Sequence, residues 1–197
     1  MATLRKERTQ RGIQALPSGA WHGCETTWGE SQRVRLVTGS PSLVESPERV
    51  RSIHAVGFVR VHGSDTAHVL LVQNKDGSYT FPGGRLEGTE TPDAALKREV
   101  WEEARAVLCP NAVQIAATRI EFLNRVPGRI HRVHPSYLLW VVAEVASLSD
   151  EACIDPAPNG VVGRRVVSVD DAHALLLPPA SLVLDAAVVL RREGGVK

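Results

Sequence analysis

The residues best spaced for chemistry in this 197-residue chain are three glutamates, Glu99, Glu102 and Glu103. A helix is expected to begin at Thr91, where a hydroxyl N-cap precedes Pro92 at the first helical position. At 100° of rotation per residue, the three carboxylates fall within an arc of about 100° on that helix. Like charges at this spacing cost roughly 0.2–0.5 kcal/mol per pair, and the C-terminal end of a helix dipole disfavours anions. The arrangement therefore predicts a partner cation that the sequence does not itself supply.

A glycine-rich loop, Phe81-Pro82-Gly83-Gly84, precedes the same helix. Glycine permits close approaches that a side chain would block, so backbone amides of this loop could face the carboxylates. Such a pair of features can hold a phosphate on one side and divalent cations on the other, because Mg²⁺ suits carboxylate, phosphate and water oxygens. Glutamates at this spacing are, taken alone, usually a solvated helix face. The loop and the opposing dipole are what favour a site.

This segment resembles the signature of the Nudix hydrolases. The signature reads glycine, five residues, glutamate, seven residues, Arg-Glu, an aliphatic residue, any residue and Glu-Glu, and the chain matches it at Gly84, Glu90, Arg98, Glu99, Glu102 and Glu103. The second glycine of the signature is replaced by Arg105, and the final aliphatic residue is Ala106. Because glycine there favours a left-handed helix end, we expect the helix to continue a little past Arg105 or to end in another way.

The resemblance implies hydrolysis of the diphosphate linkage in a nucleoside diphosphate joined to another moiety, with an ADP-ribose-like molecule or a nucleoside triphosphate as substrate. It implies Mg²⁺ as cofactor, with Mn²⁺ able to substitute. Catalysis and metal binding would fall to Glu99, Glu102 and Glu103, with the Gly84 carbonyl as a further metal ligand. Structural roles within the signature would fall to Gly83, Glu90 and Arg98, the last two through a salt bridge that shapes the loop.

Two other functions stay open beside this one. The first is a Nudix-like ligand-sensing or protein-interaction domain with weak or no catalysis. The replacement of glycine by Arg105 leaves this alternative open, whereas the three intact glutamates argue against it. The second is isomerase chemistry on an isoprenoid diphosphate, for which the chain shows no matching cysteine motif. No helix-turn-helix segment that would indicate a transcription regulator is evident.

Further candidate residues lie outside the signature. Arginine suits bidentate phosphate contacts, so a basic stretch between two expected strands could bind substrate or could be a solvated hairpin. Its members are Arg125, Arg129 and Arg132, with His131 and His134. Family members often take another acidic ligand or base from elsewhere, and the candidates are Glu121, Glu144, Asp150, Glu151 and Asp155. Glu144 lies in an expected strand and could simply face solvent, whereas Trp101 is expected to pack.

The surrounding pattern interleaves strands with a few helices. β-branched runs predict strands at residues 53–61, 68–73, 78–81, 113–124, 137–145 and 165–169, with a polar loop at 147–163. Asp170 or Asp171 is expected to cap a short helix to residue 176, and a final helix follows Pro179 to about residue 192. This order predicts an α/β (α+β) fold, a Nudix-type α/β/α sandwich with a mixed central sheet.

Two domain-level units are expected. Residues 51–197 would form the Nudix hydrolase domain. Residues 1–50 read as an N-terminal extension with one strand at residues 33–37, in which Trp21 and Trp28 fill apolar gaps. The extension would pack on the main domain or on the second subunit of a homodimer.

Composition and charge limit the remaining possibilities. A net charge of +1 gives no reason to expect binding to nucleic acid or to a membrane surface. Three widely spaced cysteines without a CxxC pair argue against a disulfide framework or a structural zinc site. No apolar run approaches the ~18 residues of a membrane span, and the basic N-terminus lacks the apolar run of a signal peptide. We therefore expect a cytoplasmic protein, and the resemblance implies a small nucleotide-type diphosphate as its substrate.

Overall fold

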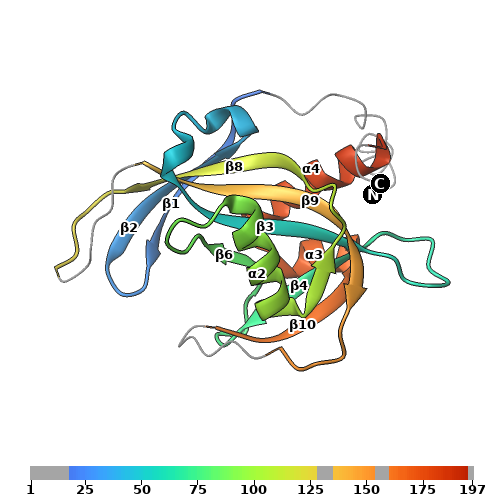
Figure 1. Cartoon of the computed structure of the whole chain (residues 1–197). Coiled ribbons are helices and arrows are strands. Elements are labelled where there is room, and N and C mark those ends of the chain that lie inside the picture. Colours follow the sequence, from blue (N-terminus) through green and yellow to red (C-terminus); the bar gives the residue numbers. More distant parts are fainter. Residues whose placement is uncertain (1–17, 128–134, 154–159, 195–197) are drawn as a thin grey trace.

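The computed structural model describes residues 18–127, 135–153 and 160–194, which form a strongly curved mixed sheet with helices on both faces (Figure 1). Along the sheet the strands run in the order β1-β2-β8-β9-β3-β4-β10. Short strands β5, β6 and β7 pair with β4, β3 and β9. The parallel pair is β3 with β9, and the other pairs in this order are antiparallel. The order places β3, which pairs with the strand β6 that contains Gly83 and Gly84, near the middle of the sheet.

The bounds of the elements follow the chain. The strands are β1 (Ala20–Trp28), β2 (Gln32–Gly39), β3 (Val50–Val59), β4 (His68–Asn74), β5 (Tyr79–Thr80), β6 (Gly83–Arg85), β7 (Ala106–Leu108), β8 (Val113–Phe122), β9 (Ser136–Leu148) and β10 (Val161–Ser168). The helices are the 3₁₀ turns η1 (Pro41–Leu43) and η2 (Pro47–Arg49) and the α-helices α2 (Pro92–Ala104), α3 (Val169–Leu175) and α4 (Ala180–Arg192). Within the described ranges, no helix is long and apolar enough to cross a membrane.

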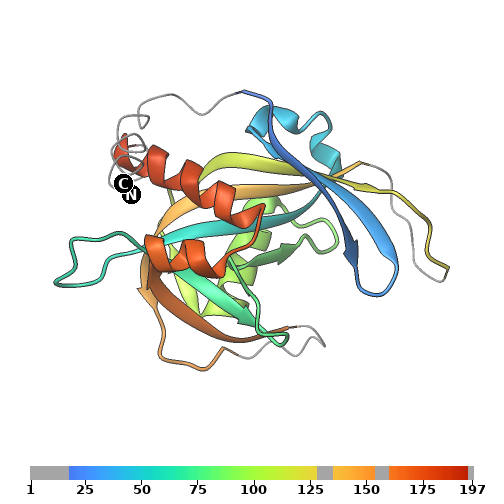
Figure 2. The ribbon, with the colours of Figure 1, turned by 180° about the vertical axis from the view of Figure 1, so that it is seen from behind.

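Alternation along β9 divides the core into two layers. Trp140 and Val142 pack in a cluster with residues of α3 and α4, whereas Leu139 and Val141 pack in a cluster with residues of α2. This follows from the two-residue period of a strand, which sends successive side chains to opposite faces. Helix α2 therefore covers one face, and α3 and α4 cover the other, as the reverse view shows (Figure 2). The predicted mixed-sheet sandwich is confirmed in its layers.

Three local predictions are wrong. Helix α3 is capped by Ser168, whose hydroxyl oxygen accepts a hydrogen bond from the Asp171 backbone N–H at 3.1 Å, and not by either aspartate. The polar loop is shorter than 147–163, because β9 continues to Leu148 and β10 begins at Val161. The N-terminal region also holds a second strand, β1, that the sequence analysis did not predict.

The two N-terminal strands join the main sheet through β8. Strand β2, which contains the predicted strand at residues 33–37, pairs with both β1 and β8. Trp21 is partly buried against the cluster on the α4 face, while Trp28 meets the edge of the Phe122 ring at 6.1 Å between centroids. These contacts tie the described part of the N-terminal region to the same sheet that carries the candidate site.

Candidate active site

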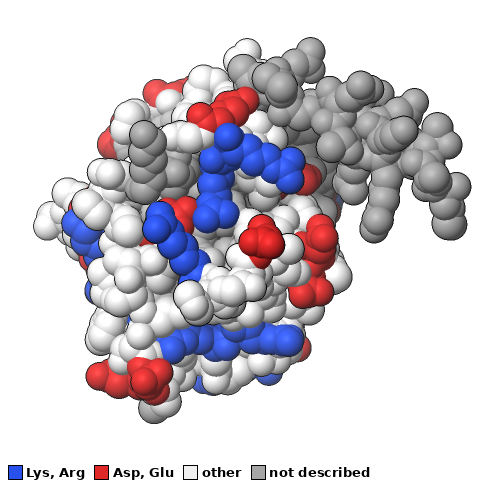
Figure 3. Space-filling model, turned by 90° about the vertical axis from the view of Figure 1, so that its right-hand side faces the viewer, with Lys and Arg blue, Asp and Glu red and all other residues white. Residues whose placement is uncertain are grey.

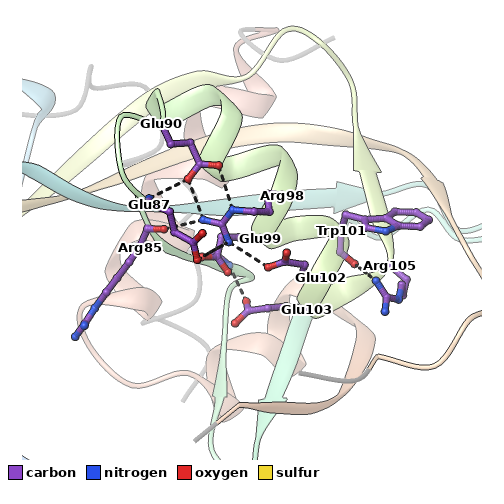
Figure 4. Close-up of polar contacts among 10 residues, drawn as sticks. Arg85, Glu87, Glu90, Arg98, Glu99, Trp101, Glu102, Glu103 and Arg105 are labelled. Atoms are coloured by element: carbon purple, nitrogen blue, oxygen red, sulfur yellow. Dashed lines mark hydrogen bonds and ion pairs between the residues drawn. The ribbon is translucent and has the colours of Figure 1, made fainter. Parts of the chain in front are cut away.

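Helix α2 holds the three glutamates in a fixed orientation. Its first turn is capped by Thr91, whose hydroxyl oxygen accepts from the Ala94 N–H at 3.3 Å. Leu96, Val100 and Ala104 are buried in the core on this side of the sheet. Because these apolar residues face the core, the acidic residues of the helix lie at the edge of the core and face the loop that carries Gly83 and Gly84 (Figure 4). The spacing read from the sequence is therefore realised in space.

Arg98 collects the acidic side chains around one guanidinium group. Its Nε and Nη2 donate to the two carboxylate oxygens of Glu90 at 3.1 and 3.0 Å. Its Nη1 donates to Glu99 at 3.0 Å and to Glu102 at 3.1 Å. A further bond, from Nη2 to the Arg85 carbonyl at 2.8 Å, ties this group to the loop. The repulsion within the glutamate cluster is thus offset by a cation of the chain itself.

The pKa shifts of Arg98 and Glu90 follow from the same contacts. The hydrogen bonds from Arg98 hold the pKa of Glu90 below its ordinary value. In turn, the bonds to Glu90, followed by those to Glu99 and Glu102, raise the pKa of Arg98 further above its usual range. Both groups are therefore charged throughout the physiological range.

The two loop glycines sit where a side chain would not fit. Gly83 has φ of 147°, and a Cβ there would overlap the Ile53 carbonyl of the neighbouring strand. A Cβ on Gly84 would overlap the carboxylate of Glu99, which occupies that space. The N–H of Gly83 also donates to Glu103 Oε2 at 2.9 Å. The loop backbone and two of the three glutamates are thus in direct contact.

A partly buried histidine that sequence reasoning missed supports this loop. His54 lies in β3 beneath Gly83, with its Nδ1 3.1 Å from the Phe81 carbonyl oxygen. Its ring lies against Trp140, with centroids 5.3 Å apart. The signal in the sequence was a single histidine within a mostly apolar strand, which is common in protein cores. Burial lowers the pKa of His54, partly opposed by its bond to the Phe81 carbonyl.

This burial predicts a dependence of stability on pH. Because the pKa of His54 is lower in the folded protein than the ~6.5 of an unfolded chain, its contribution is complete above that value and is lost as the pH falls below it. We expect the free energy of unfolding, measured by urea denaturation, to fall between pH 7 and pH 5. His54→Asn should flatten that slope, whereas His62→Asn, in an exposed loop, should leave it as in the wild type. Equal slopes in all three proteins would contradict the assignment.

Helix α2 ends at Ala104, and Arg105 adopts the left-handed conformation with φ of 47° and ψ of 41°. The prediction that arginine would prolong the helix or end it differently is wrong, because the ending is the one that glycine would have made. The Arg105 N–H donates back to the Trp101 carbonyl at 2.9 Å. The Arg105 guanidinium also lies over the Trp101 ring at 5.6 Å, and that ring is half exposed and not packed as predicted.

A distant arginine completes this helix end. Arg164 of β10 donates from Nη1 to the carbonyls of Ala104 and Arg105, and from Nη2 to the carbonyl of Ser149. The last carbonyls of a helix lack partners within the helix, and a cation beside them is favoured by the helix dipole. Arg164 therefore stabilises a helix end that Arg105 alone would make strained.

The strain at Arg105 can be measured with a matched pair of variants. Arg105→Gly and Arg105→Ala both remove the side chain, and only glycine removes the cost of the left-handed backbone. We expect the glycine variant to be more stable than the alanine variant by about 1 kcal/mol in urea denaturation. If the two variants unfold at the same denaturant concentration, position 105 does not carry backbone strain.

The donor atoms of the site suit a hard divalent cation. Within the described ranges, no three carboxylate, imidazole or thiol side chains lie close enough together to enclose a metal ion as they stand. The carboxylates of Glu99, Glu102 and Glu103 nevertheless lie along one face of α2. Because Gly84 has no Cβ, the Glu99 carboxylate can lie directly against the backbone of the loop. Glu102 has the most freedom to change partner, because its side chain is 51% exposed, against 14% for Glu99. Carboxylate and carbonyl oxygens are the ligands that Mg²⁺ prefers.

The acidic candidates outside the signature are distributed over different parts of the fold. Glu144 is buried on the α4 face of the sheet, where it binds Arg191, so it lies on the side away from α2. Glu121 pairs with Arg119 and Arg35 on β8 and β2. Glu151 lies 3.7 Å from Arg105 at the exit of α2, and Asp150 precedes it on the exposed loop. Asp155 lies outside the described residues.

The arginine candidates for substrate binding are described only in part. Arg125 is exposed just after β8, next to Asn124, whose side chain binds Gln32 and the Arg33 backbone at the start of β2. This position is separated from β3 by β9 in the sheet order. Arg129 and Arg132, together with His131 and His134, lie outside the described residues.

Comparison with known proteins identifies relatives of this arrangement. The family model of the NUDIX domain matches residues 52–191. A MutT-like protein of Streptomyces ambofaciens is 35% identical over 69 residues, which cover 34% of this chain and 42% of that protein. The match therefore spans less than half the length of this relative.

Two solved structures are similar in fold. The Bacillus subtilis pyrophosphohydrolase BsRppH has a TM-score of 0.50 at 16% identity, covering 88% of this chain and 99% of its own. The NUDIX domain of Shewanella oneidensis NrtR, solved as a complex with ADP ribose, has a TM-score of 0.52 at 19% identity, covering 78% and 92%. At these identities the two structures confirm the mixed-sheet fold.

Proposed function

This chain belongs to the NUDIX family, and from that premise we propose that it is a Mg²⁺-dependent pyrophosphohydrolase acting on a nucleoside diphosphate linked to another moiety. Family membership assigns it to the hydrolases of phosphorus-containing anhydrides. The finer proposal is that the substrate is an ADP-ribose-like molecule or a nucleoside triphosphate. The observation that carries the metal-dependent hydrolysis is the contact of Glu99 and Glu103 of α2 with the glycine loop.

The proposed roles of the side chains follow from their contacts. A bound divalent cation would polarise phosphoryl oxygens and lower the pKa of a bound water. Glu99, held by Arg98 and seated against Gly84, would be a fixed ligand. Glu102, exposed and bound to Arg98 through one oxygen, would turn toward the cation when it arrives. Mn²⁺, which shares the preference for oxygen ligands, is proposed as a substitute.

Glu103 is the residue we propose for orienting or deprotonating the attacking water. Its Oε2 accepts from the Gly83 N–H, which fixes the carboxylate beside the loop. Gly83, Glu90 and Arg98 would act indirectly, because they hold the loop and the helix face in register. We propose that the phosphates of the substrate are contacted by Arg125, Arg129 and Arg132.

A substrate panel tests this function. The purified chain is assayed with ADP-ribose, nucleoside triphosphates and other nucleoside diphosphate derivatives, each with Mg²⁺, Mn²⁺ or EDTA. We expect metal-dependent release of a nucleoside monophosphate from at least one class, and ¹⁸O-labelled water identifies the phosphorus attacked. ADP-ribose merits first place because the similar NUDIX domain of NrtR was solved with that ligand. Cleavage of none of these compounds would favour the ligand-sensing alternative instead.

The remaining expectations on location and assembly stay predictions. The three cysteines are free thiols in the structure, which suits the cytoplasmic location that we propose. Strand β1 stands at one end of the sheet order and, among the described residues, pairs with β2 alone, so we propose that a homodimer would form along its other edge. Size-exclusion chromatography with light scattering measures the assembly directly.

A further inference from the structure

A cleft of about 950 Å³ opens on the face of the sheet opposite α2. It lies where the C-terminal ends of β3 and β9 meet the loop at residues 60–67, the start of α3 and the last turn of α4. The view of this side shows basic and acidic groups gathered around a hollow (Figure 3). Its charged lining residues are Arg60, Asp65, Glu144, Asp170, Arg191 and Arg192. None of them belongs to the site on α2.

Glu144 is the unusual residue in this cleft. It continues the series Trp140 and Val142 on the face of β9 that meets α4, where an apolar side chain would be expected. The residue is 5% exposed. One oxygen, Oε1, accepts from Arg191 Nε at 2.8 Å. The other, Oε2, is buried without a hydrogen bond among the described residues, with Arg60 Nε at 3.8 Å.

An acceptor of this kind is unusual in a folded protein. Buried polar groups are nearly always hydrogen-bonded, and a buried carboxylate is costly unless its oxygens are satisfied. The Glu144 carboxylate lines the cleft, so a donor group of a ligand that displaces Arg60 could reach Oε2. Arg60 is able to move, because its side chain is 83% exposed.

The arginines supply the complementary charge. Arg191 is fixed at the floor by its bond to Glu144 and by its position over the Phe58 ring, 4.5 Å from the centroid. Arg60 and Arg192 line the cleft beside it. The guanidinium fork matches a phosphate geometrically, and its charge persists at any physiological pH. The cleft therefore contains both arginines that can bind an anion and a carboxylate oxygen that can still accept a hydrogen bond. Its volume is in the range of sites that bind small ligands.

We propose that this cleft binds a small phosphate monoester carrying hydroxyl or amine donors, of which a sugar phosphate is the simplest example. Arg60 and Arg192 bind the phosphate, and Glu144 Oε2 accepts from a hydroxyl at the other end of the ligand. Neither inorganic phosphate nor an uncharged sugar satisfies both halves of the cleft. The proposal is independent of hydrolysis at α2, because the two sites lie on opposite faces of the sheet.

Calorimetric titration of the whole chain in EDTA tests the proposal. The probes are ribose 5-phosphate, inorganic phosphate, ribose and gluconate, the last of which distinguishes a carboxylate from a phosphate. We expect ribose 5-phosphate to bind at least about tenfold more tightly than the other three. Arg60→Ser with Arg192→Ser should weaken that binding about tenfold or more. Arg33→Ser, which alters an exposed arginine on β2, is the matched control and should leave it unchanged.

Two further variants locate the ligand. Glu144→Gln should bring the affinity for ribose 5-phosphate down toward that for inorganic phosphate, and its circular dichroism reports whether the fold is kept. Should it unfold, the two exposed arginines still decide the question. Glu102→Gln with Glu103→Gln should bind ribose 5-phosphate as the wild type does. The proposal would be overturned if the wild type did not bind ribose 5-phosphate, or if the Arg33 control lost as much affinity as the arginine double variant. Loss of affinity in the double glutamine variant would also overturn it, whatever the substrate panel shows.

Discussion

Glu103→Gln is expected to lower kcat about a thousandfold on whichever substrate the wild type cleaves. Glutamine keeps the length of the side chain and an oxygen that can still accept from the Gly83 N–H, now 2.9 Å from Glu103 Oε2. The fold of the loop should therefore be preserved. What the variant loses is the negative charge, which is needed both to bind a cation and to take a proton from water.

Steady-state kinetics with Mg²⁺ measure this effect, and Glu87→Gln is the matched control. Glu87 is another glutamate near Arg98, at 3.9 Å, but its side chain is 76% exposed and it lies outside helix α2. Its variant should keep kcat within about twofold of the wild type, since single surface ion pairs contribute little. If Glu103→Gln retains full activity, the catalytic assignment to α2 is wrong, and the base must be sought elsewhere.

The features of this site that could be predicted are those encoded over short distances in the chain. The glutamates fall on one face of α2 because the period of a helix fixes their relation within five residues. The Thr91 cap and the Pro92 start are likewise local, and the structure has both. The ion pair of Arg98 with Glu102 also follows from helical spacing, because residues four apart are neighbours on a helix surface.

The features that could not be predicted depend on residues far apart in the sequence. The ending at Arg105 is held by Arg164, which is 59 residues away and reaches α2 only because β10 lies at that edge of the sheet. The sequence predicted that Glu144 lies in a strand and could face solvent. Its carboxylate is buried instead, because it accepts a hydrogen bond from Arg191 of α4, 47 residues later. Strand β1 lacks an apolar alternation because most of its residues are exposed, so only its pairing with β2 defines it.

Arg98→Ala is expected to lower the free energy of unfolding by about 2–3 kcal/mol in the absence of metal. The variant leaves Glu90 and Glu99 partly buried without their main cation, and it removes the bond to the Arg85 carbonyl. The expected loss is smaller than for a fully buried pair because the Arg98 side chain is 24% exposed. Lys97→Ala is the control: this neighbouring cation pairs with Asp93 at the surface and should cost no more than about 0.5 kcal/mol.

Adding Mg²⁺ should recover more stability in the Arg98 variant than in the wild type. A cation that binds only the folded state stabilises it by mass action, and in the variant the Arg98 guanidinium no longer competes for Glu99 and Glu102. Urea denaturation of both proteins across a Mg²⁺ titration measures the difference. If the variant is no less stable than Lys97→Ala, Arg98 does not hold the cluster together. If Mg²⁺ stabilises variant and wild type equally, the cation binds somewhere other than these carboxylates. The role of Arg98 would then be to neutralise a cluster of carboxylates that does not bind a metal.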